Sequence, residues 1–514
     1  MSQTKESALT TDKITGRLPE PKLEYRPKSP QTGYEAVYGS QQRQRASRQR
    51  RLGWCEDAQK NNPQLRSLAA ATLIFSSGGM NLASSIGFGS NNLYGTHDQV
   101  SWFIGVIIGS CISTSLVKKI SKRIFNLIAS VLVVISGIFY ITATQSTSAV
   151  ISARYCDGIA FGLTLIPAII AGSEQTVKRW RGFVLSVEQF GLAIGALIKV
   201  ISMQNAHNYK EYSTHGVIAL ILGVGAVICT FVFTLESPVF LLLKDFEDEA
   251  VNALRRLQRP ELVTHETYAL LNETKALLQE DMARESSKNM SKSWIPMIKV
   301  VLFRCFVSMS ISLPLTFTFL LATSLSSRNG IPMAPYVYLF MRLIGVIFSM
   351  FFLDTLGRRI PSSLSLFVGG GILLAAGWLA SGFWNTANAH IQPVVFLMLI
   401  YQILSGITAA SSTCYLGEAF SVSVKPQFML AAVITENVLQ ILVCCLVSTH
   451  SISNFACVLG GSQFLYAIVF FFTMPETMQT TLREALKLFQ RVFAIGTSEP
   501  DEDDEDQGDQ GDQV

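Results

Sequence analysis

The feature that most constrains this chain is the grouping of its apolar residues into twelve long blocks. Hydrophobic residues make up 49% of its 514 positions and charged residues only 15%. Each block holds roughly 18 to 25 mostly apolar residues, a length that crosses a hydrocarbon layer about 30 Å thick as an α-helix. Because backbone polar groups find no water partner in lipid, helices are expected rather than open strands. The sequence therefore predicts a polytopic membrane protein.

The blocks form two groups of six, with a polar interval between them. The predicted spans are 67–88, 99–117, 125–145, 148–171, 183–203, 215–235, 299–323, 333–353, 362–383, 393–415, 428–448 and 452–473. We expect an all-α membrane protein with twelve transmembrane helices in two six-helix halves, 67–235 and 299–473. The segment 236–298 spaces its apolar residues at three and four, which predicts amphipathic helices outside the membrane. The alternative, a soluble array of buried helices, leaves the charge distribution unexplained.

That charge distribution predicts orientation, because Lys and Arg are retained in short cytoplasmic loops. One set of alternating loops contains Lys118, Lys119, Lys122, Arg123, Lys178, Arg179, Arg181, Arg358, Arg359 and Lys425, whereas the other set contains Lys210 and Arg328. We therefore expect both termini and the segment 236–298 to be cytoplasmic. The plasma membrane is the expected location.

Both ends of the chain are polar. Residues 1–66 are expected to be a disordered N-terminal tail, and residues 474–514 a cytoplasmic segment that ends in an acidic tail. The run RQRASRQRR supplies cations that suit an anionic inner leaflet, namely Arg43, Arg45, Arg48, Arg50 and Arg51. A solvated basic tail is the alternative interpretation.

Five motifs follow one another in a recognisable order. The first is RYCDGIAFGLTLIPAIIAGSEQTVKRWRG, where Gly158, Gly162, Glu174 and Arg181 follow Arg154 at fixed spacings. The others are ESPVFLLLKDFEDEA, LDTLGRR, GEAFSVSVK and MPETMQTTLREAL. Over roughly residues 65–490 the chain resembles the sugar porter family of the major facilitator superfamily. Within that family it resembles the insect facilitated trehalose and hexose transporters.

The resemblance implies a cytoplasmic gate made by carboxylates and arginines at the helix ends. The implied gate residues are Glu174, Arg181, Asp354, Arg358, Arg359 and Glu418. Such groups form charge-assisted, often bidentate bonds that can hold two halves together and release. Anchoring of helix ends in the lipid headgroups is the alternative. The loop KKISKR has no carboxylate where the family has one, so the first-half gate is expected to be altered.

Departures from the family concern the substrate positions. The run FRCFVSMSISLPLTFTF offers only Ser308, Ser310, Ser312 and Thr316 in place of the family's glutamines, and a polar run ending at Thr413 replaces a Gly-Pro-rich turn. Polar groups at membrane depth are functional candidates because their burial is costly. The candidate substrate contacts are Gln189, Asn437, Glu436, Arg342 and Thr413. Mutual neutralisation of Arg342 and Glu436 is an equally open interpretation, and Glu188 can be assigned to the gate instead.

The chain has no zinc-spaced Cys and His cluster, phosphate-binding glycine loop or nucleophilic triad. We therefore expect no enzymatic activity, no cofactor, no metal and no nucleic-acid partner. The predicted function is facilitative, alternating-access transport of a sugar, hexose or trehalose-like, or a related polyol. A proton-linked variant that uses Glu436 stays open. The alternatives are a transporter-derived sensor without sugar flux and a carrier of a charged organic solute.

Overall fold

The computed structural model describes residues 54–89, 95–142, 146–205, 210–286, 294–326, 333–381, 391–447 and 451–493. Residues 1–57 and 58–514 form two separate units, and the described part of the first unit is the start of α2 (Trp54–Arg66). The basic run with Arg43, Arg45, Arg48, Arg50 and Arg51 lies outside the described residues. So does the acidic tail.

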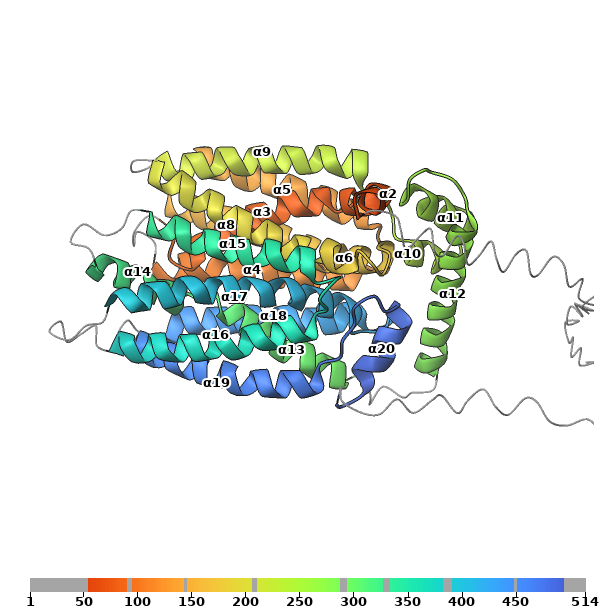
Figure 1. Cartoon of the computed structure of the whole chain (residues 1–514). Helices are drawn as coiled ribbons and strands as arrows, with labels where there is room; N and C mark the ends of the chain where they lie inside the picture. Colours follow the sequence, from red (N-terminus) through yellow and green to blue (C-terminus); the bar gives the residue numbers. More distant parts are fainter. Residues whose placement is uncertain are drawn as a thin grey trace, which may run out of the picture. The chain divides into compact units, whose positions relative to one another are not determined.

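The second unit is a bundle of long helices that run side by side (Figure 1). Its first half consists of α3 (Ala69–Ser85), α4 (Gly95–Leu116), α5 (Lys122–Thr142), α6 (Thr147–Gln175), α7 (Arg181–Leu185), α8 (Val187–Asn205) and α9 (Lys210–Phe233). Its second half consists of α13 (Trp294–Met309), α14 (Leu313–Ser326), α15 (Ala334–Phe352), α16 (Arg359–Ala380), α17 (Ile391–Glu418), α18 (Lys425–Leu446) and α19 (Ile452–Thr473). Helices α10 (Pro238–Leu242), α11 (Glu247–Arg256) and α12 (His265–Ser286) connect the halves, and α20 (Leu482–Gln490) follows the last long helix.

The predicted fold class is confirmed. Eleven helical segments among the described residues are long and apolar enough to cross a membrane. The first predicted span corresponds to α3, which has only 17 residues and is buried along most of its length. Helix α4 packs against α6, α5 against α9 and α3 against α8, while α16 packs against α19 and α13 against α18. The halves meet where α4 contacts α18 and where α8 contacts α15.

Close packing in the first half depends on small residues. A Cβ atom on Gly109 would lie 2.3 Å from the carbonyl oxygen of Ile159, and one on Gly162 would lie 2.3 Å from that of Val106. Helices α4 and α6 therefore approach backbone to backbone, as small residues allow in membrane bundles.

The span predicted as one helix over 299–323 is instead two helices, because α13 ends at Met309 and α14 begins at Leu313. Pro314 lacks the N–H that would bond to the carbonyl of Ser310, four residues earlier. Side chains from neighbouring helices bond to carbonyl groups at this break. The amide of Gln440 donates to the carbonyl oxygen of Ser308 at 2.7 Å, and that of Gln402 to that of Ser310 at 3.3 Å. A break of this kind is tolerated in a membrane where protein buries it.

The N-terminal segment differs from the disorder expected up to residue 66. Helix α2 extends to Arg66, and residues from its second turn onward form contacts with other parts of the chain. The Lys60 ammonium pairs with Glu266 of α12 at 2.8 Å, and the buried Gln64 accepts from the backbone N–H of Val177 at 3.2 Å. These contacts depend on residues distant in sequence, so composition alone did not reveal them.

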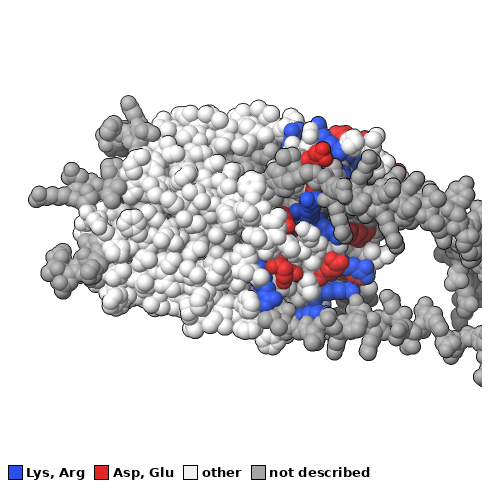
Figure 2. All heavy atoms as spheres, viewed as in Figure 1, with Lys and Arg blue, Asp and Glu red and all other residues white. Residues whose placement is uncertain are grey.

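The charged residues gather at one end of the bundle, called here the charged end. It comprises the loops 117–121, 176–180, 353–358 and 419–424 together with α10, α11, α12 and α20. Figure 2 shows Lys, Arg, Asp and Glu concentrated over this end, while the visible remainder of the described surface is almost free of them.

Candidate functional site

A cavity lies between the two halves of the bundle. Its lining comprises Leu82, Trp102, Phe103, Phe161, Glu188, Gln189, Leu192 and Ala193 from the first half, with Arg304, Val307, Ser308, Ile311, Arg342, Glu436, Asn437 and Gln440 from the second. The cavity has a volume of about 70 Å³. An apolar wall with a few converging polar groups is typical of small-molecule sites.

The first half supplies the aromatic part of this wall. The indole N–H of Trp102 donates to Asp157 Oδ2 at 3.2 Å, and the hydroxyl of Ser77 donates to Asp157 Oδ1 at 2.5 Å. The Trp102 ring also lies against Phe161, with centroids 5.3 Å apart. The buried Asp157 therefore fixes the orientation of a ring that faces the cavity. Sequence analysis missed Asp157, although it is an ionisable residue inside an apolar span.

The charged part of the cavity is the Arg304 triad, formed by Arg304, Glu188 and Glu436. The guanidinium binds the Glu436 carboxylate side-on, with Nε–Oε2 at 2.8 Å and Nη2–Oε1 at 2.9 Å. It also reaches Glu188 at 3.4 Å, which joins α13 of the second half to α8 of the first. A paired arrangement of this kind offsets the cost of burying each charge.

This triad bears on two assignments that the sequence left open. Glu436 pairs with Arg304 and not with Arg342, and Glu188 belongs to the cavity and not to the charged end. Arg304 was overlooked in the run FRCFVSMSISLPLTFTF, although a cation inside an apolar span is the same signal that selected Arg342. The sequence of one span does not show which helix faces meet, so the carboxylates that pair with Arg304 could not be predicted.

The predicted substrate contacts are largely brought together. Gln189, Asn437, Glu436 and Arg342 all line the cavity. The amide of Gln189 donates to Glu188 Oε1 at 3.0 Å, and that of Asn437 to the carbonyl oxygen of Val433 at 2.7 Å. Thr413 differs, because it is absent from the lining and its hydroxyl donates to Glu188 Oε2. Thr413 thus orients a cavity residue from behind.

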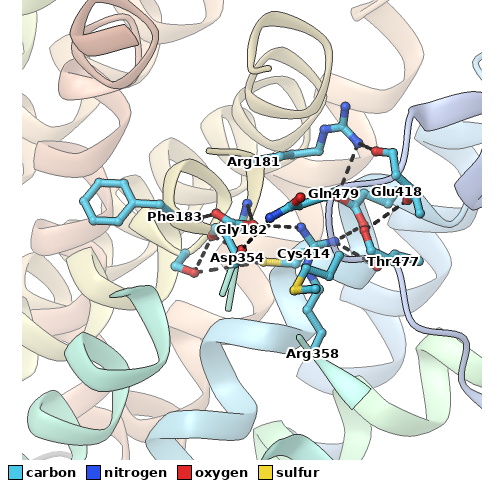
Figure 3. A network of polar contacts seen from close by, with 12 residues as sticks. Arg181, Gly182, Phe183, Asp354, Arg358, Cys414, Glu418, Thr477 and Gln479 are labelled. Atoms are coloured by element: carbon cyan, nitrogen blue, oxygen red, sulfur yellow. Dashed lines mark hydrogen bonds and ion pairs between the residues drawn. The ribbon is translucent and has the colours of Figure 1, made fainter. Parts of the chain in front are cut away.

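At the charged end, a second network joins the halves (Figure 3). Asp354, in the loop after α15, accepts from the backbone N–H groups of Gly182 at 3.0 Å and Phe183 at 2.9 Å. Burial raises the pKa of the Asp354 carboxyl above its ordinary value, while Arg358 and these two N–H groups act in the opposite direction. We call Arg181, Asp354, Arg358 and Glu418 the charged-end network.

Glu418 is the centre of this network. Its carboxylate bonds to Arg358 and lies 3.5 Å from Arg181 of the first half, and its side chain is fully buried. Arg358 also donates to the hydroxyl of Thr477 at 2.8 Å. Burial alone would lower the pKa of Arg358, but Glu418, Cys414, Asp354 and Tyr415 together outweigh that effect and the pKa is raised. The charge-assisted bonds thus span both halves and the segment before α20.

Two predicted gate residues lie beside this network. Glu174 pairs with Lys122 of the first half at 2.9 Å and accepts from the hydroxyl of Ser237, at the start of the segment that connects the halves. The guanidinium of Arg359 donates to the carbonyl oxygen of Phe471 at 2.8 Å and has no carboxylate partner among the described residues. Its backbone N–H donates to Glu476 Oε2 at 2.9 Å.

The two halves repeat part of this architecture. The backbone N–H of Lys122, at the start of α5, donates to the Glu236 carboxylate at 3.3 Å. In the second half, the backbone N–H of Arg359, at the start of α16, donates to the Glu476 carboxylate in the same way. The cross-half contacts are not equivalent, however. In the first-half loop, Lys118 reaches the carbonyl oxygen of Ser423 at 2.6 Å instead of offering a carboxylate to backbone N–H groups.

Comparison with known proteins gives these features a context. The family model described as "Sugar (and other) transporter" matches residues 78–489, which is more than half of the chain. The chain belongs to this sugar transporter family. The sugar porter family predicted from the five motifs is thereby confirmed.

Two curated relatives and one solved structure illustrate the similarity of this sugar transporter family member to known proteins. A probable inositol transporter of Arabidopsis thaliana is 24% identical over 297 residues, covering 55% of this chain and 50% of the relative. A high glucose sensor of Saccharomyces cerevisiae is 21% identical over 440 residues, covering 78% of this chain and 56% of the sensor. The chain therefore spans about half the length of these curated relatives. The proton:xylose symporter XylE, solved with 6-bromo-6-deoxy-D-glucose, shares the fold with a TM-score of 0.64 at 16% identity, covering 83% of this chain and 98% of XylE.

Proposed function

We propose that the protein is an alternating-access carrier that moves a sugar or related polyol down its gradient, without cofactor or chemical conversion. The observation that carries this proposal is a cavity lined from both halves, together with bonds between the halves at the charged end. Polar groups beside Trp102 suit a solute that presents hydroxyls on its edges and C–H groups on its faces. The inositol and glucose named for its relatives support a polyhydroxylated solute.

The proposed solute contacts are Gln189, Asn437, Glu436 and Arg342, with Thr413 acting through Glu188. The decisive experiment is uptake of labelled glucose, trehalose and myo-inositol into vesicles that contain the purified protein. Saturable uptake is expected, with strong loss in Gln189→Ala. The matched control is Gln392→Ala, because Gln392 is exposed at the start of α17. Absence of uptake for every sugar and polyol tried, charged or neutral, would refute the assignment. Trehalose is an essential member of the panel, because the sequence is predicted to resemble the insect trehalose and hexose transporters within the family.

The proposed cytoplasmic gate consists of Glu174, Arg181, Asp354, Arg358, Arg359 and Glu418. Its support is the set of cross-half bonds from Asp354 and Glu418.

With the charged end assigned to the cytoplasm by the positive-inside rule, both termini lie there too. The proposed location is the plasma membrane, with Arg43, Arg45, Arg48, Arg50 and Arg51 attracted to anionic inner-leaflet lipid. Glycosylation tags inserted in the loops 143–146 and 117–121 test this topology, because only the first should be modified.

A second candidate function is a sensor that no longer moves sugar. It is favoured by the likeness to the yeast glucose sensor over 78% of this chain. Deletion of residues 1–53 and 494–514 spares α2 and α20 and separates the two functions. A carrier keeps its flux after this deletion, whereas a sensor that signals through its tails loses its output.

A further inference from the structure

Two arginines line the cavity, and their hydrogen bonding differs. All three nitrogens of the Arg304 guanidinium are engaged, by Glu436, Glu188 and Ser412. Arg304 is thus a saturated cation. It shares two carboxylates, so the Arg304 triad has a formal charge of −1.

Arg342, on α15, is engaged through a single nitrogen. Its Nη1 contacts the hydroxyls of Ser405 at 2.9 Å and Ser310 at 3.2 Å, and Gln402 Oε1 at 3.5 Å. Within the described part of the chain, Nε and Nη2 form no hydrogen bond, and neither is sealed from the cavity. The residue is only 4% exposed, and no described carboxylate pairs with it. Its charge is therefore held beside the cavity by neutral groups alone.

The Nε/Nη2 edge of Arg342, which has no described partner, can be compared with the same edge of Arg304. Nε and Nη2 are the two nitrogens with which Arg304 binds the Glu436 carboxylate side-on, at 2.8 and 2.9 Å. The guanidinium presents parallel N–H groups on this edge, which match the two oxygens of a carboxylate. Arg304 thus shows how a carboxylate would dock on Arg342.

The support of Arg342 is rigid. Gln402 is fully buried, and its amide donates to the hydroxyl of Tyr338 at 2.7 Å and to the carbonyl oxygen of Ser310. Ser310 belongs to the break between α13 and α14, so the broken helix contributes directly to the position of this guanidinium. A donor pair held in place before binding loses less conformational freedom on binding.

From these relations we propose that Arg342 binds a carboxylate group of the transported solute, so that the preferred solute is a sugar acid with one negative charge. This inference rests on the proposed function and specifies its substrate class. The hydroxyls of such a solute contact Gln189 and Asn437, while its carboxylate docks on the Nε/Nη2 edge. A phosphate dianion fits less well, because its second charge meets the −1 of the Arg304 triad.

The test compares glucuronate with glucuronamide, which has the same shape but no charge, and with glucose and glucose 6-phosphate. Each is used to compete for uptake in vesicles and to stabilise the purified full chain against thermal unfolding. Glucuronate is expected to bind at least about tenfold more tightly than glucuronamide, as a charge-assisted bidentate pair provides. In Arg342→Gln the preference for glucuronate over glucuronamide is expected to disappear. The readout is this preference and not the level of neutral-sugar uptake, because Arg342 is also one of the proposed solute contacts. Arg342→Lys should retain only part of the preference for glucuronate, because a lysine ammonium lacks the paired N–H groups of a guanidinium.

The comparison of glucuronate with glucuronamide can be made in the unaltered protein. It therefore tests the inference even if Arg342→Gln does not fold. Equal binding of glucuronate and glucuronamide, with normal entry of neutral sugars, overturns the inference and leaves the proposed function standing. Tighter binding of glucose 6-phosphate than of glucuronate overturns the carboxylate assignment. If no sugar, charged or neutral, binds or enters, the proposed function is wrong and the inference falls with it.

Discussion

The carboxylate of Asp354 accepts a hydrogen bond from the backbone N–H of Gly182 at 3.0 Å, although 172 positions separate the two residues. Gly182 is also a place where a side chain has no room, because a Cβ atom would lie 2.4 Å from Asp354 Oδ1. A loop of the second half is thereby seated directly on the first turn of α7 in the first half. Motion of one half against the other must break this contact.

Asp354→Asn is expected to loosen the charged end. An amide carries no charge and offers one oxygen where the carboxylate offers two, so one N–H of Gly182 or Phe183 loses its acceptor. Cys414 is a native reporter, since it is fully buried with Sγ 3.4 Å from the carbonyl oxygen of Gly182. Its labelling by a membrane-permeant maleimide, read by mass spectrometry, should accelerate about tenfold, because a hydrogen bond to a charged group contributes about 1.5–3 kcal/mol. Glu249→Gln on the exposed face of α11 is the control, and equal labelling of both variants would argue against a closing role for Asp354.

Glu418→Gln is expected to lower stability sharply. Arg358 and Arg181 share this carboxylate. Its loss removes the counter-charge of the buried Arg181 and leaves Arg358 with the more distant carboxylate of Asp354, at 3.4 Å, so we expect a cost of about 3–5 kcal/mol. The midpoint of thermal unfolding in detergent should fall accordingly. Lys275→Gln removes the exposed pair with Glu247 and should cost no more than about 1 kcal/mol. Similar losses in the two variants would contradict the central role of Glu418.

Arg304→Gln is expected to be more harmful alone than in combination. The single change leaves Glu188 and Glu436 buried without their cation, which we expect to cost about 3–5 kcal/mol. Adding Glu436→Gln removes one of the stranded charges, so the double variant should recover part of the folded, monodisperse yield. A double variant worse than both single variants would show that the triad is not an energetic unit.

Two glycine substitutions are expected to have opposite effects. In Gly195→Ala the new Cβ atom would lie 1.9 Å from the carbonyl oxygen of Ser76, so α8 must move away from α3 at a cost of about 1–3 kcal/mol. In Gly371→Ala, on α16, the new atom meets nothing within 4 Å, and the higher helix propensity of alanine should raise stability by up to about 1 kcal/mol. Thermal midpoints of the two variants measure the contrast. A fall of equal size in both would show that this helix contact is not tight.

Much of the fold could be predicted because the relevant physics acts on consecutive residues. Lipid imposes a length and an apolar character on each crossing helix, so the twelve spans and their division into two sixes were legible in the sequence. The spacing of Glu174, Arg181, Asp354 and Glu418 likewise identified the family, because those positions recur in fixed motifs. The positions of Gln189, Asn437, Glu436 and Arg342 were selected by the cost of burying polar groups, which also operates residue by residue.

What the sequence by itself determined, then, is the fold class, the family and a list of buried polar groups. The tertiary structure alone decided their pairing: Arg304 with Glu436 and Glu188, Asp354 with Gly182, and Arg342 with neutral groups only. The reason is that a salt bridge depends on which helix faces meet, and those contacts join residues that lie 116 to 172 positions apart in the first two cases. Helix periodicity determines which face is polar but not which neighbouring helix that face will contact.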